Sequence, residues 1–246
     1  GIHAEQVDRY LDHGYTVVSI DYRLAPETKL AAIIEDIADA VAWVSSEGRA
    51  LFAADPSRIG VVGHSAGGYL TLMSGFAVKP RPKALVSFYG YGDIIGDWYS
   101  KPDPFYCREE PVTRQEAEAA IGGTTVSESA GERWRFYLYC RQNGLWPLEV
   151  VGHDPILDAA AFRQYCPILN VSPDYPATML LHGDKDTDVP YEQSVMMHAA
   201  LAKANVESEL VTIAGGEHGF DARHEDPVVS GALERAVAFF DRYLQQ

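Results

Sequence analysis

Cysteine and long apolar runs are both scarce in this chain of 246 residues. The three cysteines, Cys107, Cys140 and Cys166, form no C-x-x-C pair. An odd and widely spaced set argues against a disulfide framework and favours a reducing compartment, so we expect a cytoplasmic protein. No apolar run reaches the roughly 18 residues that a membrane-spanning helix needs.

Positive charge is also scarce, with 20 Lys and Arg against 35 Asp and Glu and a net charge of −15. Nucleic acids and anionic membrane surfaces need clustered Lys and Arg, so neither is an expected partner. The sequence shows no phosphate-binding loop and no His and acidic cluster at metal-ligand spacing. It therefore predicts no cofactor and no metal.

The residues that are abundant predict an α/β protein. Apolar runs typical of buried strands lie at 15–22, 57–64, 83–90, 177–183 and 207–215. Apolar residues at helical spacing lie at 33–44, 67–77, 191–204 and 229–244. The first of these segments follows Pro26, a residue suited to a first helical turn. This alternation predicts a mostly parallel, doubly wound sheet with helices on both faces.

One long segment, residues 91–170, interrupts the alternation and is rich in aromatic residues. A structureless loop of that length is improbable inside a compact domain, so we predict a cap or lid inserted into a catalytic domain made of 1–90 and 171–246. Most of the aromatics would build the core of the cap. Some would line a substrate pocket, and the candidates are Trp98, Tyr99, Phe105, Tyr106 and Trp146.

The segment "GHSAG", residues 63–67, is a G-x-S-x-G motif between a predicted strand and a predicted helix. A tight turn there would hold Ser65 in a strained conformation with its hydroxyl exposed at the carboxyl end of the sheet. We expect that side chains at Gly63 and Gly67 would collide with the neighbouring strand and helix. The placement of the motif indicates a nucleophilic serine.

A serine nucleophile needs a base and an acid, and on such a fold they follow in the order Ser, acid, His. His218 lies in the glycine-flanked loop "GGEHGF", after the last predicted strand. Three aspartates alternate in "LHGDKDTDVP", and the spacing selects Asp186 over Asp184 and Asp188, which we expect to cap the turn or face solvent. We expect His182 to brace this loop.

Together these motifs resemble the α/β-hydrolase superfamily. The chain is similar to its hormone-sensitive-lipase-like and carboxylesterase group, with kinship to prolyl-oligopeptidase-type hydrolases. The residues that carry the resemblance are "DYRLAPE" (21–27), "GHSAGG" (63–68), "LHGDKDTDVP" (181–190) and "GGEHGF" (215–220). The resemblance implies a catalytic triad of Ser65, Asp186 and His218. It also implies that Asp21, Arg23 and Glu27 hold a turn by salt bridging.

The chain shows one serious departure from that family. The family carries an H-G-G-type oxyanion segment upstream of "DYRLAPE", and this sequence shows neither that segment nor the strand before it. We therefore expect that amino-terminal strands are missing. The backbone N–H of Ala66 is the identifiable oxyanion donor, and no second donor can be assigned from the sequence.

The sequence predicts a serine hydrolase that cleaves small to medium carboxylic esters through an acyl-enzyme. Its partner would be a small-molecule ester, and a homo-oligomer is compatible with the sequence. Two alternatives remain. One is a serine aminopeptidase or oligopeptidase, and the other is a catalytically impaired binding protein on the same fold.

Overall fold

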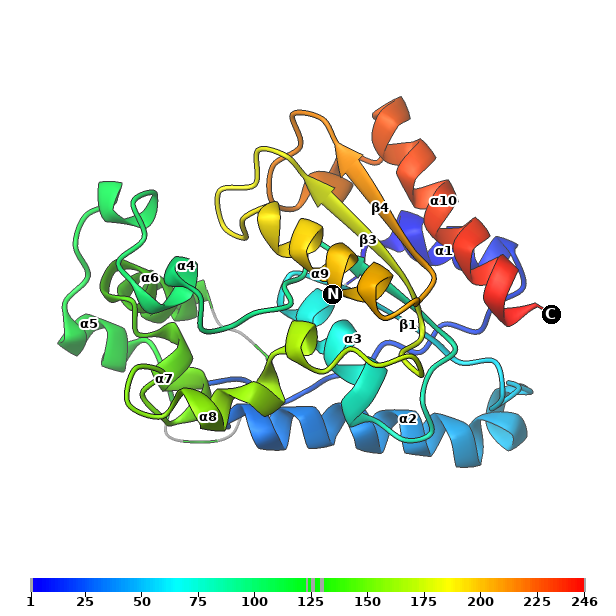
Figure 1. Cartoon of the computed structure of the whole chain (residues 1–246), viewed down its shortest axis with the longest axis horizontal. Helices are drawn as coiled ribbons and strands as arrows, with labels where there is room; N and C mark the ends of the chain where they lie inside the picture. The colour runs from blue at the N-terminus through cyan, green and yellow to red at the C-terminus, as the bar shows by residue number, and fades with distance from the viewer. Residues whose placement is uncertain (1, 123, 125–126, 129–130, 246) are drawn as a thin grey trace. The chain divides into compact units, whose positions relative to one another are not determined.

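The computed structural model describes residues 2–122, 124, 127–128 and 131–245 and forms two compact units (Figure 1). The first unit comprises Gly1–Ile20, Ile37–Gly92 and Pro167–Gln246, and the second comprises Asp21–Asp36 and Asp93–Cys166. The second unit contains most of the predicted cap together with residues 21–36, and its role as a lid stays a prediction.

The helices and strands of the first unit alternate along the chain, and its boundary with the second falls inside α2. They are α1 (Ala4–Asp12), α2 (Leu30–Phe52), β1 (Gly60–His64), α3 (Ala66–Ala77), β2 (Ala84–Phe88), η4 (Pro167–Leu169), β3 (Ala177–Gly183), α9 (Glu192–Lys203), β4 (Ser208–Ile213), η5 (Phe220–Ala222) and α10 (Pro227–Leu244). Among the described residues, none of these helices or those of the second unit is both long and apolar enough to cross a bilayer.

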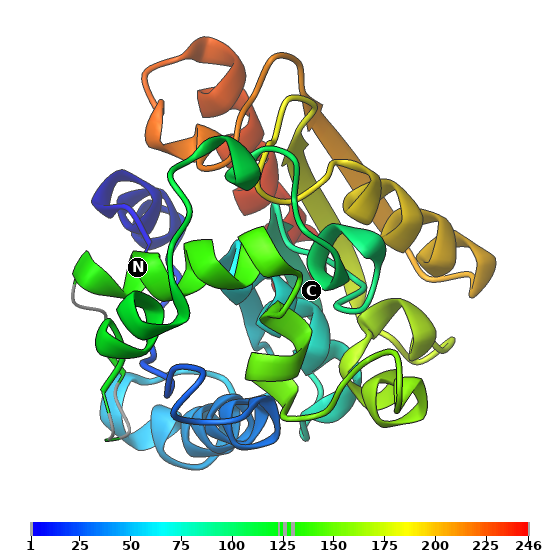
Figure 2. The same cartoon turned by 90° about the vertical axis from the view of Figure 1, so that its left-hand side faces the viewer.

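Apart from the beginning of α2, the second unit is built from short helices (Figure 2). They are α4 (Asp97–Ser100), η1 (Tyr106–Arg108), α5 (Arg114–Ala119), η2 (Gly131–Arg133), α6 (Trp134–Asn143), α7 (Trp146–Val151), α8 (Ala159–Phe162) and η3 (Arg163–Tyr165). In the "DYRLAPE" segment, Arg23 pairs with Asp36, with Nε 2.9 Å from Oδ1. Glu27 pairs with Arg133. Arg23 and Glu27 therefore form salt bridges, as the resemblance implies, and their partners lie farther along the chain.

The sheet of the first unit confirms the predicted fold class. Its four strands run parallel in the order β1-β2-β3-β4, with Val61 opposite Leu85, Leu85 opposite Thr178, and Thr178 opposite Ser208. Parallel strands place all their carboxyl ends at one edge. The loops after β1, β3 and β4, which carry the three predicted catalytic residues, therefore open onto the same edge.

Helices cover both faces of this sheet, as the alternation of apolar segments predicts. On one face, α10 packs on Val86, Met179 and Leu181 through a large buried cluster that includes Phe239 and Phe240. On the other, α3 and α9 pack on Leu85 and Leu180 through Leu72, Met197 and Leu201 (Figure 1). Each fully buried side chain of this kind contributes about 1.5–3 kcal/mol relative to an exposed one.

The predicted strand at 15–22 is wrong, because these residues are irregular in the structure. Tyr15 and Val17 pack against the main core, whereas Val18 and Ile20 are exposed. A strand exists only where a neighbour completes its hydrogen-bond ladder. Among the described residues β1 pairs with β2 alone and all five of its residues are half-buried, so β1 lies at an edge of the sheet.

The first long helix also begins later than expected. We predicted that Pro26 would occupy its first turn, but α2 starts at Leu30 and Pro26 lies in the turn before it. Leu30, Ile33, Ile37 and Val41 are buried along one face of α2, which is the spacing that predicted the helix.

The start of α3 lies very close to the sheet, and two glycines make this approach possible. A Cβ atom at Gly63 would overlap the carbonyl group of Gly67 and lie 2.7 Å from Thr71 Oγ1. A Cβ atom at Gly68 would lie 2.8 Å from the carbonyl oxygen of Phe88. The prediction for Gly63 is confirmed, but the one for Gly67 is wrong, because a Cβ atom there would meet no described heavy atom within 4 Å. Gly68 is the position where the helix needs the space.

Replacing Gly63 by alanine should therefore destabilise the protein, whereas replacing Gly67 by alanine should not. Gly63→Ala should lower the free energy of unfolding by about 1–3 kcal/mol, because the new methyl group overlaps backbone that cannot move away cheaply. Gly67→Ala should leave stability unchanged or raise it by about 0.5–1 kcal/mol, because alanine is the better helix former. Urea unfolding of the two variants beside the unsubstituted chain measures this. Equal losses would contradict the packing described for Gly63.

Candidate active site

Ser65 occupies the strained turn between β1 and α3. Its backbone has φ 54° and ψ −119°, a conformation that non-glycine residues rarely adopt. The amide N–H of Ser65 donates to the carbonyl of Phe88 at 3.0 Å, and Tyr69 N–H donates to the carbonyl of Ser65 at 2.9 Å. The strand before the serine and the helix after it thus fix the position of its hydroxyl.

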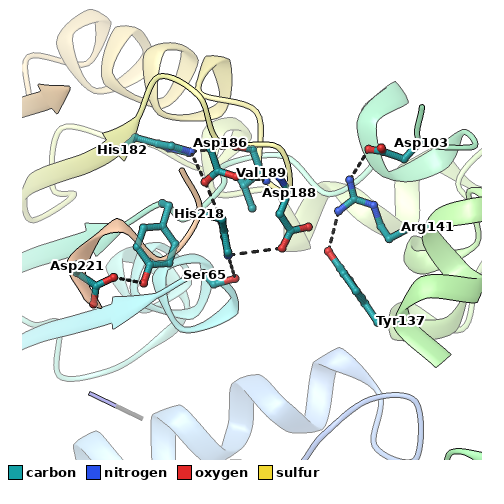
Figure 3. A network of polar contacts seen from close by, with 11 residues as sticks. Ser65, Asp103, Tyr137, Arg141, His182, Asp186, Asp188, Val189, His218 and Asp221 are labelled. Atoms are coloured by element: carbon teal, nitrogen blue, oxygen red, sulfur yellow. Dashed lines mark hydrogen bonds and ion pairs between the residues drawn. The ribbon is translucent and has the colours of Figure 1, made fainter. Parts of the chain in front are cut away.

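The structure brings Ser65, His218 and Asp186 into one hydrogen-bonded row (Figure 3). His218 Nε2 lies 2.9 Å from Ser65 Oγ, and His218 Nδ1 lies 2.8 Å from Asp186 Oδ2. Ser65 follows β1, Asp186 follows β3 and His218 follows β4. This geometry suits a serine whose proton is taken by an imidazole that a carboxylate orients.

Asp186 is a fully buried carboxylate that is compensated on both oxygens. The backbone N–H groups of Asp188 and Val189 each donate to Oδ1 at 2.9 Å. Burial by itself raises the pKa of Asp186, but the hydrogen bonds with His182 and His218 outweigh it and hold this pKa well below the ordinary range. Asp186 is therefore ionised whenever His218 can act as a base.

His182 braces this loop, as expected. Its ring is fully buried, with Nε2 3.0 Å from the carbonyl of Val189 and 3.3 Å from Asp186 Oδ2. Its Nδ1 lies 2.7 Å from Ser194 Oγ on α9. The side chain ties the turn after β3 to the helix that follows, which keeps the Asp186 carboxylate in position.

His218 has a raised pKa. Burial disfavours the imidazolium, but the hydrogen bond to Asp186 and the negative charges of Asp188, Asp186 and Asp221 outweigh burial and raise the pKa of His218 above its ordinary value. Asp188 Oδ2 lies 3.5 Å from His218 Nε2. The expectation of a capping or solvent-facing role for Asp188 missed this approach, which spacing along the chain could not reveal.

Asp184 is exposed, and its Oδ1 accepts from the N–H of Gly215 at 2.7 Å, so it binds the turn after β4 rather than its own turn. Ala66 is the first residue of α3, and the first amides of a helix have no acceptor within the helix. Its N–H can therefore face a negative charge at the positive end of the helix dipole. Its role as an oxyanion donor stays a prediction.

The five predicted pocket residues lie in the second unit, around a buried arginine. The Arg141 guanidinium lies 5.5 Å from the ring centre of Trp98, 4.8 Å from that of Tyr99 and 4.7 Å from that of Tyr106. Phe105 packs edge-on against Tyr106, and Trp146 lies 6.4 Å from Tyr99. Of these aromatics, Tyr99 and Tyr106 are buried in their unit, whereas Phe105 is exposed. Their contribution to a substrate pocket stays a prediction.

Residues 11–222 match the sequence profile of a family described as alpha/beta hydrolase fold. The chain therefore belongs to this family, and the resemblance stated from the four motifs is confirmed. The triad of this fold runs in the order nucleophile, acid, histidine along the chain, which is the order of Ser65, Asp186 and His218 after β1, β3 and β4.

Solved structures show the same fold. A protein of unknown function from Staphylococcus aureus matches with a TM-score of 0.78 and 23% identity, over 99% of this chain and 83% of that one. Carboxyl esterase 2 from Tuber melanosporum matches with a TM-score of 0.66 and 21% identity, over 98% of this chain and 72% of that one.

Among curated proteins, the chain is similar to fungal non-reducing polyketide synthases. It is 30% identical over 292 residues to Preu3 from Preussia isomera and 28% identical over 270 residues to ausA from Emericella nidulans. These matches cover 96% and 89% of this chain and 11% of each relative. The chain thus spans about a ninth of the length of these relatives.

Proton NMR titration should find the pKa of His218 above about 6.5, the ordinary value of histidine. Asp186→Asn should lower it, because the substitution removes the negative charge and the strongest acceptor beside the imidazolium. Asp184→Asn is the matched control, since its carboxylate binds the Gly215 amide, and it should leave the titration unchanged. Equal pKa values in all three proteins would contradict the assignment of Asp186 as the partner of His218.

Proposed function

We propose that this protein is a serine hydrolase that cleaves carboxylic esters through a covalent acyl-enzyme. The observation that carries the proposal is the row of hydrogen bonds from Asp186 through His218 to Ser65, with distances of 2.8 and 2.9 Å. The family match and an esterase among the structural neighbours support it.

In the first half of the proposed reaction, Ser65 Oγ attacks the ester carbonyl while its proton passes to His218 Nε2. The oxyanion that forms accepts from the Ala66 N–H at the start of α3, and one such donor contributes on the order of 3 kcal/mol. The C–O bond to the alcohol then breaks, and the imidazolium returns the proton to the leaving oxygen. Asp186 stabilises the imidazolium throughout without taking its proton.

Water completes the cycle by the same route. A water molecule attacks the acyl-enzyme while His218 removes its proton. His218 then protonates Ser65 Oγ as the carboxylic acid leaves. The raised pKa of His218 makes it the stronger base, at the cost of a larger protonated fraction near pH 7. The catalytic groups are all side chains or backbone of this chain, so the reaction as proposed calls for no cofactor.

An acyl thioester is the second candidate substrate class. The matches to non-reducing polyketide synthases favour this class. The same nucleophile, base and oxyanion donor can attack a thioester carbonyl. A peptide bond is the third class to test, since its cleavage by a serine nucleophile uses the same steps. The cap, proposed here from residues 91–170, would select among acyl groups.

A fluorophosphonate should label the protein once, and tryptic mass spectrometry should place the adduct on Ser65. Ser65→Ala should abolish labelling and lower kcat by on the order of 10⁴–10⁶. The substrates are p-nitrophenyl esters from acetyl to palmitoyl, an acyl thioester and a peptide anilide. Ser57→Ala is a matched control on the same unit, because that hydroxyl binds Asp55 in an exposed turn.

An adduct at another residue, or full activity in Ser65→Ala, would refute the proposal. Labelling at Ser65 with hydrolysis of the thioester alone would keep the nucleophile and change the substrate class. Hydrolysis of the anilide alone would favour the peptidase.

The three aspartates after β3 should differ sharply in their effect on kcat. Asp186→Asn should lower kcat by on the order of 10⁴, because an amide cannot hold the imidazole in the required tautomer or stabilise its charge. Asp188→Asn should have a far smaller effect, and Asp184→Asn the smallest. Steady-state kinetics on the preferred substrate measures the series. If Asp188→Asn were the most damaging, the orienting acid would be misassigned.

A further inference from the structure

A second carboxylate, Asp221, is buried near the proposed base and has no part in the row of Ser65, His218 and Asp186. It lies in η5, three residues after His218, with a side chain 2% exposed. In the view of Figure 3 it lies on the opposite side of His218 from Asp188. A buried carboxylate is costly unless donors satisfy it, so its partners indicate what it does.

The strongest of these partners is a tyrosine. Tyr89 Oη donates to Asp221 Oδ1 at 2.6 Å. Burial first, and then the charge of Asp221, raise the pKa of Tyr89 far above its ordinary value, so the phenol keeps its proton and donates it.

Two histidines lie farther from the carboxylate. His64 Nε2 is 3.4 Å and His3 Nε2 is 3.7 Å from Asp221 Oδ2. Burial lowers the pKa of His64 to about 4, so that ring is uncharged near neutral pH.

Tyr89 is fixed in its backbone as well as at its hydroxyl. It follows β2 directly and has φ +38°, a region that a tyrosine rarely occupies. Its N–H donates to the carbonyl of Leu181 on β3 at 2.7 Å. With its backbone and its hydroxyl both held, the Tyr89 side chain has a fixed position in the core.

The fixed ring lies against the imidazole. The ring centres of Tyr89 and His218 are 4.6 Å apart with an angle of 60° between the planes, and Phe220 lies 5.5 Å from Tyr89 on an edge-to-face contact. Hydrogen bonds to Ser65 and Asp186 hold the two nitrogens of the imidazole, and its remaining motion is a small rotation about the Cβ–Cγ bond. A side chain packed against the ring restrains that rotation.

We propose, resting on the function proposed above, that Tyr89 and Asp221 are a positioning pair for His218: the buried carboxylate fixes the phenol, and the phenol ring holds the imidazole in the plane that aims Nε2 at Ser65. The groups that face His218 are then Asp186 and Asp188 from the loop after β3, Ser65 from the turn after β1, Tyr89 from the end of β2, and Asp221 from η5. Asp221 also adds negative charge on the side of the imidazolium away from Asp188.

The experiment compares Tyr89→Phe and Asp221→Asn with a matched pair in the same unit. Tyr15 Oη donates to Asp241 Oδ1 at 2.8 Å, and Tyr15 packs on the same core as Tyr89, so Tyr15→Phe and Asp241→Asn remove the same kind of hydrogen bond elsewhere. The readouts are the rate of fluorophosphonate labelling of Ser65 against pH, kcat and KM separately, and the low-field proton NMR resonance of the His218 Nδ1 proton.

Tyr89→Phe should lower the plateau labelling rate and kcat about tenfold with KM unchanged, because a displaced base loses rate steeply. Its Nδ1 resonance should shift or broaden. Asp221→Asn keeps an acceptor for Tyr89 but removes the charge, so the acid limb of the labelling profile should move to lower pH. Tyr15→Phe and Asp241→Asn should leave the plateau labelling rate within twofold of that of the unsubstituted chain. They should shift neither the acid limb of the profile nor the Nδ1 resonance.

The proposal is overturned if Tyr89→Phe and Asp221→Asn behave like the control pair, or if both fail to fold, which would make the pair structural. If one of them fails to fold, the other decides by the same readouts. Labelling reports on the base without a substrate. A protein that is labelled at Ser65 yet cleaves none of the esters, thioester or anilide would end the proposed function, and the comparison of variants would still stand.

Discussion

The close backbone contact between the start of α3 and the ends of β1 and β2 is the constraint on which the rest of the site depends. It requires hydrogen in place of a side chain at Gly63 and Gly68. Because helix and strands meet at this distance, the chain can pass between them only through the rare conformation of Ser65. The Ser65 amide donates to Phe88 on β2, so the hydroxyl is fixed by the sheet itself rather than by a loop.

The second requirement of the site is electrostatic. A carboxylate without solvent must be satisfied by the protein, and Asp186 is satisfied by two backbone N–H groups and by imidazole rings on either side. The same contacts that keep it charged also fix where it lies. The ionised carboxylate then raises the pKa of His218. Preorganisation of this kind means that the groups need no rearrangement when charge moves onto the imidazole.

Every strand of the described sheet supplies part of this arrangement at its carboxyl end. Ser65 follows β1, Tyr89 follows β2, Asp186 follows β3, and the loop after β4 carries His218. A parallel sheet gathers these four chain segments at one edge by its topology. The Phe88 carbonyl at the end of β2 accepts from the Ser65 amide. The positioning pair that we propose gives the end of β2 a second contribution to the site, through Tyr89.

The sequence by itself determined the class of the sheet, most of its helices and strands, and the order of Ser65, Asp186 and His218, because periodicity and turn motifs are local properties. Tertiary structure decided the rest. Residues 15–22 have the apolar pattern of a strand, but among the described residues they pair with no neighbouring strand. Gly68 rather than Gly67 carries the close approach, and Tyr89 meets Asp221 across 132 positions. Such contacts depend on which strands become neighbours and in which register, and spacing along the chain does not encode that.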